Sequence, residues 1–267
     1  MNKSAINPIQ KIITRIQELK AQKIERQRIK TLTKELIDVV KNPDEDAVKK
    51  IKYLVRQGAN VNTFDMSKER SLVHFAAEQD RLDVVKALIE CGCKKYINFY
   101  DSSGKDPAFY AIDHNNPEML DYLLSHGVST MRPGDFSYES SFRYAVRSGH
   151  TKLVEIELKH GADINDHVGE HFTQYNKYER FYPGPTPLAE VTSGREVADG
   201  LDGNMKKYYD KKMIVFLLQK GARTDIKNEY GNDVNYLWNI PEIKNAVNSP
   251  RKKQSTPSIL KKNHREY

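Results

Sequence analysis

The sequence has few of the features that mark secreted, disulfide-bonded or membrane-spanning proteins. Its 267 residues include 2 cysteines and 1 tryptophan. Two thiols cannot build the disulfide framework that stabilises small secreted domains, so a reducing, cytoplasmic environment is expected. No apolar run reaches the length of a membrane span. The N-terminal stretch MNKSAINPIQKIITRIQELK mixes charges with apolar residues, which is unlike a secretory signal.

Motifs of common catalytic sites are also missing. The sequence has no G-x-x-x-x-G-K-[ST], G-x-S-x-G or G-x-G-x-x-G pattern. His167, Glu170 and His171 have the H-x-x-E-H spacing of some zinc proteases, but an intervening glycine predicts a loop where that site needs a helix. Cys91 and Cys93 lack the second cysteine pair of a structural zinc site. We therefore expect no catalysis, no metal and no cofactor.

Positive charge is in excess, but it is confined to the two ends of the chain. There are 43 basic and 36 acidic residues, which gives a net charge of +7. Residues 1–34 hold nine basic and two acidic residues, and residues 248–267 hold six and one. The body between them is therefore acidic, with a net charge of −5. A membrane or nucleic-acid partner would have to bind the ends.

The body contains a repeat of about 34 residues. Similar strings, from QGANVN to QKGARTD, place glycines at Gly58, Gly92, Gly127, Gly161 and Gly221, with spacings of 34, 35, 34 and 60. Paired apolar residues precede these glycines at the spacing of a helix that is buried on one side and ended by glycine. A second helix signal lies earlier in each unit, as SLVHFAA (71–77), DPAFYAI (106–112), SSFRYAV (140–146) and TPLAEVT (186–192).

These strings resemble the ankyrin repeat, whose signature T-P-L-H-x-A-A precedes a helix that ends in G-A-D-x-N. Thr186, Pro187 and Leu188 match the signature directly, and His74, Ala76 and Ala77 match it in the second repeat. The resemblance implies an all-α repeat solenoid of helix-turn-helix units with β-hairpin loops. It covers residues 31–247 as about six repeats, with insertions at 167–185 and 193–208 in the long fifth repeat. The second insertion is polar and contains glycines, and its middle is expected to be a flexible loop.

The two ends of the chain are expected to differ in structure. Residues 1–30 predict a basic amphipathic helix, which either caps the exposed edge of the first repeat, binds a partner or membrane surface, or serves as a nucleic-acid arm. Residues 248–267 are polar, basic and proline-containing, which predicts a disordered tail.

The resemblance further implies that the chain is a scaffold that binds another protein, with no small-molecule substrate and as a monomer. Its concave surface would be formed by hairpin tips and inner-helix ends. Residues of the insertion at 167–185 are aromatic, and they either bind the partner or hold their own loop in place. The candidate binding residues are Phe64, Asp65, Met66, Lys68, Gln79, Asp80, Arg81, Tyr100, Asp101, Ser103, His114, Asn115, Arg132, Tyr138, Arg147, Phe172, Tyr175, Tyr178, Phe181, Tyr182 and Tyr230.

Composition adds a hypothesis about origin. Abundant Lys, Asn, Ile and Tyr indicate an AT-rich genome, and together with degenerate repeats this suggests an effector of an intracellular bacterium, or a viral protein, that acts in a host cytosol or nucleus. The alternative function is peripheral binding of anionic membrane or nucleic acid through the basic ends.

Overall fold

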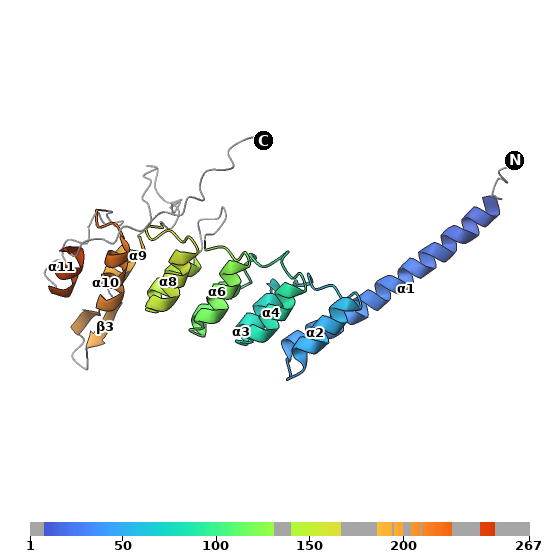
Figure 1. The fold of residues 1–267 in the computed structure, drawn as a ribbon, viewed down its shortest axis with the longest axis horizontal. Coiled ribbons are helices and arrows are strands. Elements are labelled where there is room, and N and C mark those ends of the chain that lie inside the picture. Colours follow the sequence, from blue (N-terminus) through green and yellow to red (C-terminus); the bar gives the residue numbers. More distant parts are fainter. Residues whose placement is uncertain are drawn as a thin grey trace. The chain divides into compact units, whose positions relative to one another are not determined.

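A computed structural model describes residues 8–130, 140–166, 186–193, 195–199, 204–208, 210–225 and 241–248 (Figure 1). The chain divides into two compact units, Met1–Thr130 and Met131–Tyr267. The first unit contains α1 (Pro8–Lys41), α2 (Ala47–Arg56), β1 (Phe64–Asp65), β2 (Arg70–Ser71), α3 (Leu72–Glu78), α4 (Leu82–Glu90), α5 (Pro107–Asp113) and α6 (Pro117–Ser125). The second contains α7 (Ser141–Arg147), α8 (Thr151–Lys159), α9 (Pro187–Ser193), β3 (Arg195–Asp199), β4 (Asn204–Tyr208), α10 (Lys211–Lys220) and α11 (Pro241–Asn248).

The short first helix of each repeat begins where a side chain caps it, as the sequence predicts. The carboxylate of Asp106 accepts a hydrogen bond from the Ala108 amide at the start of α5. The Ser140 hydroxyl does the same for α7, and the Thr186 hydroxyl accepts from the amide of Ala189 in α9. Such bonds satisfy amides that a helix start would otherwise leave unpaired.

The second helix of each repeat ends at a glycine in the left-handed region of backbone conformation. The five repeat glycines have φ between 91° and 101°. In each case the residue after the glycine donates its amide to the carbonyl five residues earlier, as Cys93 does to Leu88 at 3.0 Å. This pattern is the Schellman motif, and it explains why glycine recurs at these positions.

The two helices of a repeat pack on each other and on the next repeat. In the first unit α3 packs against both α4 and α5, and α5 packs against α6. In the second unit α7 packs against α8 and α9, and α9 packs against α10. The core consists of the paired apolar residues that the sequence pattern identifies, among them Val84, Val85, Leu88, Met119, Leu120, Leu123, Met213, Ile214 and Leu217.

Asparagines at the end of the repeats link each to the following one. The side chain of Asn62 donates to the Gly92 carbonyl at 3.0 Å and accepts from the amides of Lys94 and Lys95. Asn98 bonds in the same way to Gly127, 29 residues further along. Asn165 accepts from the Arg223 amide across a separation of 58 residues. The long fifth repeat therefore keeps the same junction although it contains two insertions.

The second insertion forms a β-hairpin. Strands β3 and β4 pair antiparallel from Arg195 opposite Tyr208 to Asp199 opposite Asn204. The two strands lie on either side of the glycine-containing middle of the insertion, residues 200–203. The flexible loop was expected in that middle part, which lies outside the described residues. The first insertion at 167–185, the H-x-x-E-H segment and residues 249–267 of the tail lie outside the described residues, whereas Asn248 is the last residue of α11.

Helix α1 is continuous across residue 30, where a boundary between terminal helix and first repeat was expected. Its final turns bury Leu36 and Val40 and pack against α2 and α3, so they form the first helix of repeat one. The amide of Asn60 donates to the Thr33 hydroxyl at 2.9 Å. Residues 9–27 are exposed and clear of the repeats (Figure 1), so they do not cap the repeat edge. No helix in the described ranges, α1 included, combines the length and apolarity needed to cross a membrane.

His74 joins the second repeat to the loop that leads into the third. Its ring is fully buried, and Nδ1 accepts hydrogen bonds from the amide and hydroxyl of Ser71 at 3.3 and 2.8 Å. Because Nδ1 accepts from an amide, Nε2 carries the proton, and it donates to the Phe99 carbonyl at 2.9 Å. Burial lowers the pKa of His74 to about 4, against partial compensation by the Phe99 carbonyl.

We predict that Gly92→Ala lowers the free energy of unfolding by about 1 kcal/mol, because an alanine at φ +91° is strained. Its added Cβ would meet no atom within 4 Å, so the loss reflects backbone conformation alone. Denaturant unfolding measures the change. Gly92→Asn is the matched variant and should lose less, since asparagine tolerates this conformation better. An alanine variant as stable as the wild type would contradict the prediction.

We also predict an acid-sensitive contribution from His74. Protonation favours the unfolded chain, because the pKa is lowered in the folded state from 6.5 to about 4. The stabilisation is complete above pH 6.5 and is lost as the pH falls toward 4. Between about pH 7 and pH 5 the wild type should lose about 2 kcal/mol more stability than His74→Gln, measured by denaturant unfolding. Equal losses in both proteins would refute this assignment.

Candidate functional site

The inner-helix side of repeats two and three is occupied by alternating cations and aromatic rings. Lys41 lies over the Phe75 ring, with Nζ 4.7 Å from the centroid. The Arg70 guanidinium lies between Phe75 and Tyr110, at 5.8 and 5.3 Å from their centroids. Lys105 contacts the Tyr110 ring from its own repeat at 5.6 Å. These contacts join the end of α1 to α3 and α5.

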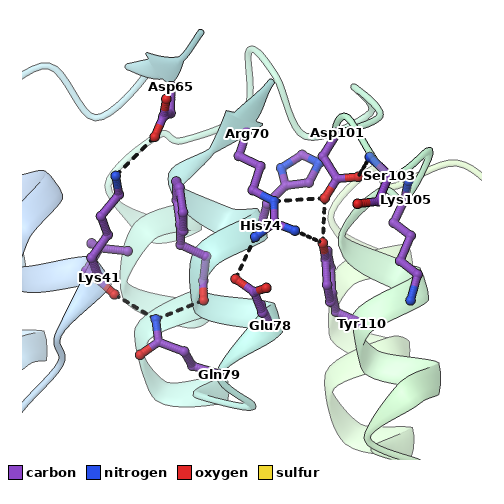
Figure 2. A network of polar contacts seen from close by, with 12 residues as sticks. Lys41, Asp65, Arg70, His74, Glu78, Gln79, Asp101, Ser103, Lys105 and Tyr110 are labelled. Atoms are coloured by element: carbon purple, nitrogen blue, oxygen red, sulfur yellow. Dashed lines mark hydrogen bonds and ion pairs between the residues drawn. The ribbon is translucent and has the colours of Figure 1, made fainter. Parts of the chain in front are cut away.

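Arg70 is the centre of a buried hydrogen-bond network, shown in Figure 2. Its Nε donates to Asp101 at 2.8 Å, Nη1 to Glu78 at 2.6 Å, and Nη2 to the Tyr110 hydroxyl. The Tyr110 hydroxyl donates in turn to Asp101. The side chains of Arg70 and Asp101 are 9% and 0% exposed, so the ion pair is almost fully withdrawn from water.

The surroundings keep Asp101 charged in spite of its burial. Burial opposes ionisation, but hydrogen bonds from Tyr110 and from the backbone amides of Lys105 and Ser103 outweigh it, so the pKa of Asp101 is lowered. Burial, together with the hydrogen bond to this carboxylate, raises the pKa of Tyr110. The group is therefore a satisfied structural cluster.

Asp101 was expected on the partner-binding surface, and the structure corrects that prediction. Its carboxylate is buried and engaged by Arg70, Tyr110 and two amides, so no oxygen faces a partner. Sequence position suggested a hairpin tip, but a carboxylate there can equally turn inward to a neighbouring repeat. The cation that draws it inward lies 31 residues away in the sequence.

Several candidate residues at the inner-helix ends also connect repeats. Gln79 donates to the carbonyls of Val40 and Phe75, both at 3.0 Å. His114 lies with Nε2 2.8 Å from the Glu78 carbonyl. These side chains are half-buried or exposed, but part of their hydrogen-bonding capacity is used within the fold.

Two further candidates of this group serve as repeat links. Arg81 pairs with Asp83 at 2.7 Å and donates to the Pro43 carbonyl at 3.1 Å. Asp80 accepts from Asn116 at 2.8 Å. The remaining described candidates of this surface, Ser103, Asn115 and Arg147, are exposed.

At the first hairpin, Asp65 orders the tip. It accepts hydrogen bonds from the Ser67 amide and hydroxyl, and it pairs with Lys41 at 3.0 Å. The Ser67 hydroxyl and the Lys41 ammonium together lower the pKa of Asp65 to about 2. Met66, held at this tip, is 80% exposed, and Lys68 is exposed beside it.

Three aromatic rings from two successive repeats meet beside this hairpin. Phe64 lies 4.9 Å from Tyr96 and 5.8 Å from Phe99, measured between ring centroids, and Tyr96 lies 5.1 Å from Phe99. Phe99 remains 49% exposed. We call Phe64, Tyr96 and Phe99 the hairpin cluster. Edge-to-face pairs of this kind are stabilising, yet here they leave apolar surface in water.

Phe64 and Met66 were predicted as binding residues from the sequence, whereas Tyr96 and Phe99 were not. The neighbouring Tyr100 was predicted to lie on the surface, and it is half-buried. A usable signal was present, because the KKYINFY segment spaces two rings three residues apart just after a repeat glycine. The remaining candidates, Arg132, Tyr138, Phe172, Tyr175, Tyr178, Phe181, Tyr182 and Tyr230, lie outside the described residues.

Metal binding finds no support among the described residues, where no group of three or more His, Cys, Asp or Glu side chains could hold an ion. Cys93 is buried and lies 3.2 Å from the Val61 carbonyl, and burial raises the pKa of its thiol to about 12. Its surroundings are those of a packed core residue and not of a thiolate ligand.

Comparison with known proteins agrees with this architecture. Residues 36–134 match the family model for ankyrin repeats in three copies. Of the solved structures, the crystal structure of the ankyrin repeat protein EF0377 is similar, with a TM-score of 0.58 and 22% identity over 80% of this chain and 96% of that one.

Two curated proteins are similar in sequence over part of the chain. A protein of Acanthamoeba polyphaga mimivirus that is named as an ankyrin repeat protein is 25% identical over 119 residues, which are 43% of this chain and 15% of that protein. An Arabidopsis thaliana protein, XBAT31, named for an inferred E3 ubiquitin-protein ligase activity, is 28% identical over 87 residues, 29% of this chain and 19% of that one. The chain thus spans less than a fifth of the length of either relative. Residues 36–134 therefore belong to the ankyrin repeat family, and the chain has the ankyrin repeat fold.

Proposed function

We propose that the chain is a non-catalytic scaffold that binds another protein, and that its first unit does so through the hairpin cluster and the adjacent Met66. Ankyrin repeats generally mediate protein–protein interaction. The observation that supports this particular surface is the exposed half of Phe99 within a group of three rings.

The physical basis is a preorganised apolar surface. Phe64 and Phe99 come from successive repeats, and their rings pack edge to face with centroids 5.8 Å apart. A partner would therefore bury aromatic area at little cost in side-chain entropy. Aromatic residues and methionine are enriched at the centres of protein interfaces, and methionine adapts its shape to a partner.

The inner-helix face of repeats two and three is less suited to partner binding than the hairpin cluster. The guanidinium of Arg70 and the carboxylate of Asp101 are buried and already hydrogen-bonded to each other, so a partner would gain little from them. The cluster instead offers apolar area that is not covered by the described fold.

Charge near the cluster suggests the chemistry of the partner. Lys68, Lys94 and Lys95 are exposed, and the Lys95 ammonium lies 5.0 Å from the centroid of the Tyr96 ring. A partner with an apolar centre and an acidic rim would complement this surface.

The mimivirus relative supports an origin in a large virus. The same proposal includes that the protein acts as an effector in a reducing host cytosol.

We predict that Phe99→Ser reduces recovery of the partner about tenfold in a quantitative pull-down with the full chain, because it removes the exposed ring at the centre of the surface. The matched control is Tyr53→Ser, which removes an aromatic ring that is 60% exposed on α2. The His74 bond uses the Phe99 backbone, so the fold should persist, as thermal unfolding would verify. Equal recovery with Phe99→Ser and wild type would rule out the hairpin cluster.

The aromatic insertion of the fifth repeat is the second proposed contact. Deleting residues 167–185, which leaves α9 and its packing against α7 and α10 in place, should weaken partner recovery in the same assay if Phe172, Tyr175, Tyr178, Phe181 and Tyr182 touch the partner. Undiminished recovery would show that these rings serve only their own segment.

A further inference from the structure

The exposed part of α1 has an apolar stripe along one side. Its acidic residues lie opposite this stripe, and basic residues lie beside and beyond it. Ile9, Ile12, Ile13, Ile16 and Leu19 are between 42% and 64% exposed. At about 100° per residue they fall within an arc of about 120° on one side of the helix. No other described element covers this arc, because residues 9–28 are exposed throughout.

The acidic residues of this segment lie on the far side of the helix. Glu18 and Glu25 are about 160° to 180° away from the middle of the apolar arc on the same helical geometry. They form ion pairs with Arg15 at 3.1 Å and with Arg28 at 3.0 Å. Negative charge is therefore both removed from the apolar face and neutralised locally.

Basic residues lie at the edge of the apolar arc and on the same side of the helix in the turns that follow it. Arg26 falls just beyond the Leu19 edge, and Lys20 and Lys23 fall within the same arc one turn further along the chain. Lys20, Lys23 and Arg26 form no ion pair among the described residues, and all three are exposed. One face thus presents isoleucine and leucine over three turns, followed by uncompensated positive charge.

We propose that this face of α1 binds the surface of a bilayer that contains anionic lipid. An interfacial helix places its apolar side at the headgroup boundary and its basic residues against lipid phosphates. Lysines can extend their charged ends to the headgroups while their methylene chains stay with the apolar side chains. The site is separate from the hairpin cluster and is independent of the proposed partner binding.

Other occupants fit the observations less well. A second copy would bring two helices of the same positive charge together, and the stripe is shorter than the three heptads that a stable coiled coil requires. Nucleic acid would leave the isoleucines in water. A groove on an acidic protein would have to cover the face that carries Lys20 and Lys23, and would bury both ammonium groups.

The free position of the segment allows contact with a flat surface. Residues 8–28 extend from the repeats for about 30 Å at the rise of an α-helix (Figure 1). The first tether to a repeat is Arg28, whose Nη2 donates to the Gln57 carbonyl at 3.2 Å. The helix can therefore lie on a membrane without displacing a contact of the fold.

The test is co-sedimentation of the full chain with vesicles of phosphatidylcholine that contain about 30 mol% phosphatidylserine. The wild type should bind these vesicles at least about tenfold more strongly than pure phosphatidylcholine vesicles, and raising salt from about 0.1 to about 0.5 M should weaken binding. Hydrogen exchange should slow over residues 9–19 on the vesicles. Absence of binding at low salt, or equal binding to both vesicle types, would overturn the proposal.

Two pairs of variants separate the apolar and charged contributions. Ile12→Asn with Ile16→Asn should reduce vesicle binding about tenfold or more. Lys20→Glu with Lys23→Glu should do the same, whereas the matched control, Lys211→Glu with Lys212→Glu on the exposed start of α10, should change it less than about twofold. Vesicle binding that survives the α1 changes would overturn the proposal, as would loss of binding to an equal extent in the control. Phe99→Ser should leave vesicle binding intact, so failure here and failure of partner binding are distinguishable.

Discussion

The first unit depends on the contact between the Arg70 guanidinium and the Asp101 carboxylate. Burying either group alone would be costly, and the pair is tolerated because Tyr110, Glu78 and two backbone amides satisfy the remaining hydrogen-bonding positions. Arg70 belongs to the strand before α3, whereas Asp101 precedes α5, so one side chain holds two repeats in register. The same guanidinium lies against two aromatic rings, which extends the contact along the inner-helix face.

Polar side chains on the inner-helix face bond neighbouring repeats to each other, so fewer of them are available to bind a partner. Gln79, Arg81 and His114 also bridge neighbouring repeats, so much of the polar surface at the inner-helix ends serves the fold. Exposed apolar surface remains at the hairpin cluster and along the first part of α1. One surface is rigid and set by packed rings, and the other is a solvated helix, which suits them to different classes of partner.

Much of the fold could be predicted from the sequence because its strongest signals are local. A glycine after a helix and a capping residue before one act within five residues, and all five repeat glycines take the expected conformation. The sequence was a poorer guide to which side chains lie on the binding surface. Asp101 was expected there and is buried, and Tyr96 and Phe99 were not predicted. Whether a hairpin residue points outward depends on a neighbouring repeat about thirty residues away, and composition carries no record of that geometry.

The sequence by itself determined the repeat period, the ends of the helices and the confinement of positive charge to the termini, because each follows from short-range backbone chemistry or from counting. The tertiary structure alone decided that α1 runs unbroken from the solvent into the first repeat, that β3 and β4 pair within an insertion, and that Arg70 draws Asp101 inward. These outcomes depend on which groups meet across distant parts of the chain. Such a meeting is favourable only when burial, charge and hydrogen bonding are satisfied together.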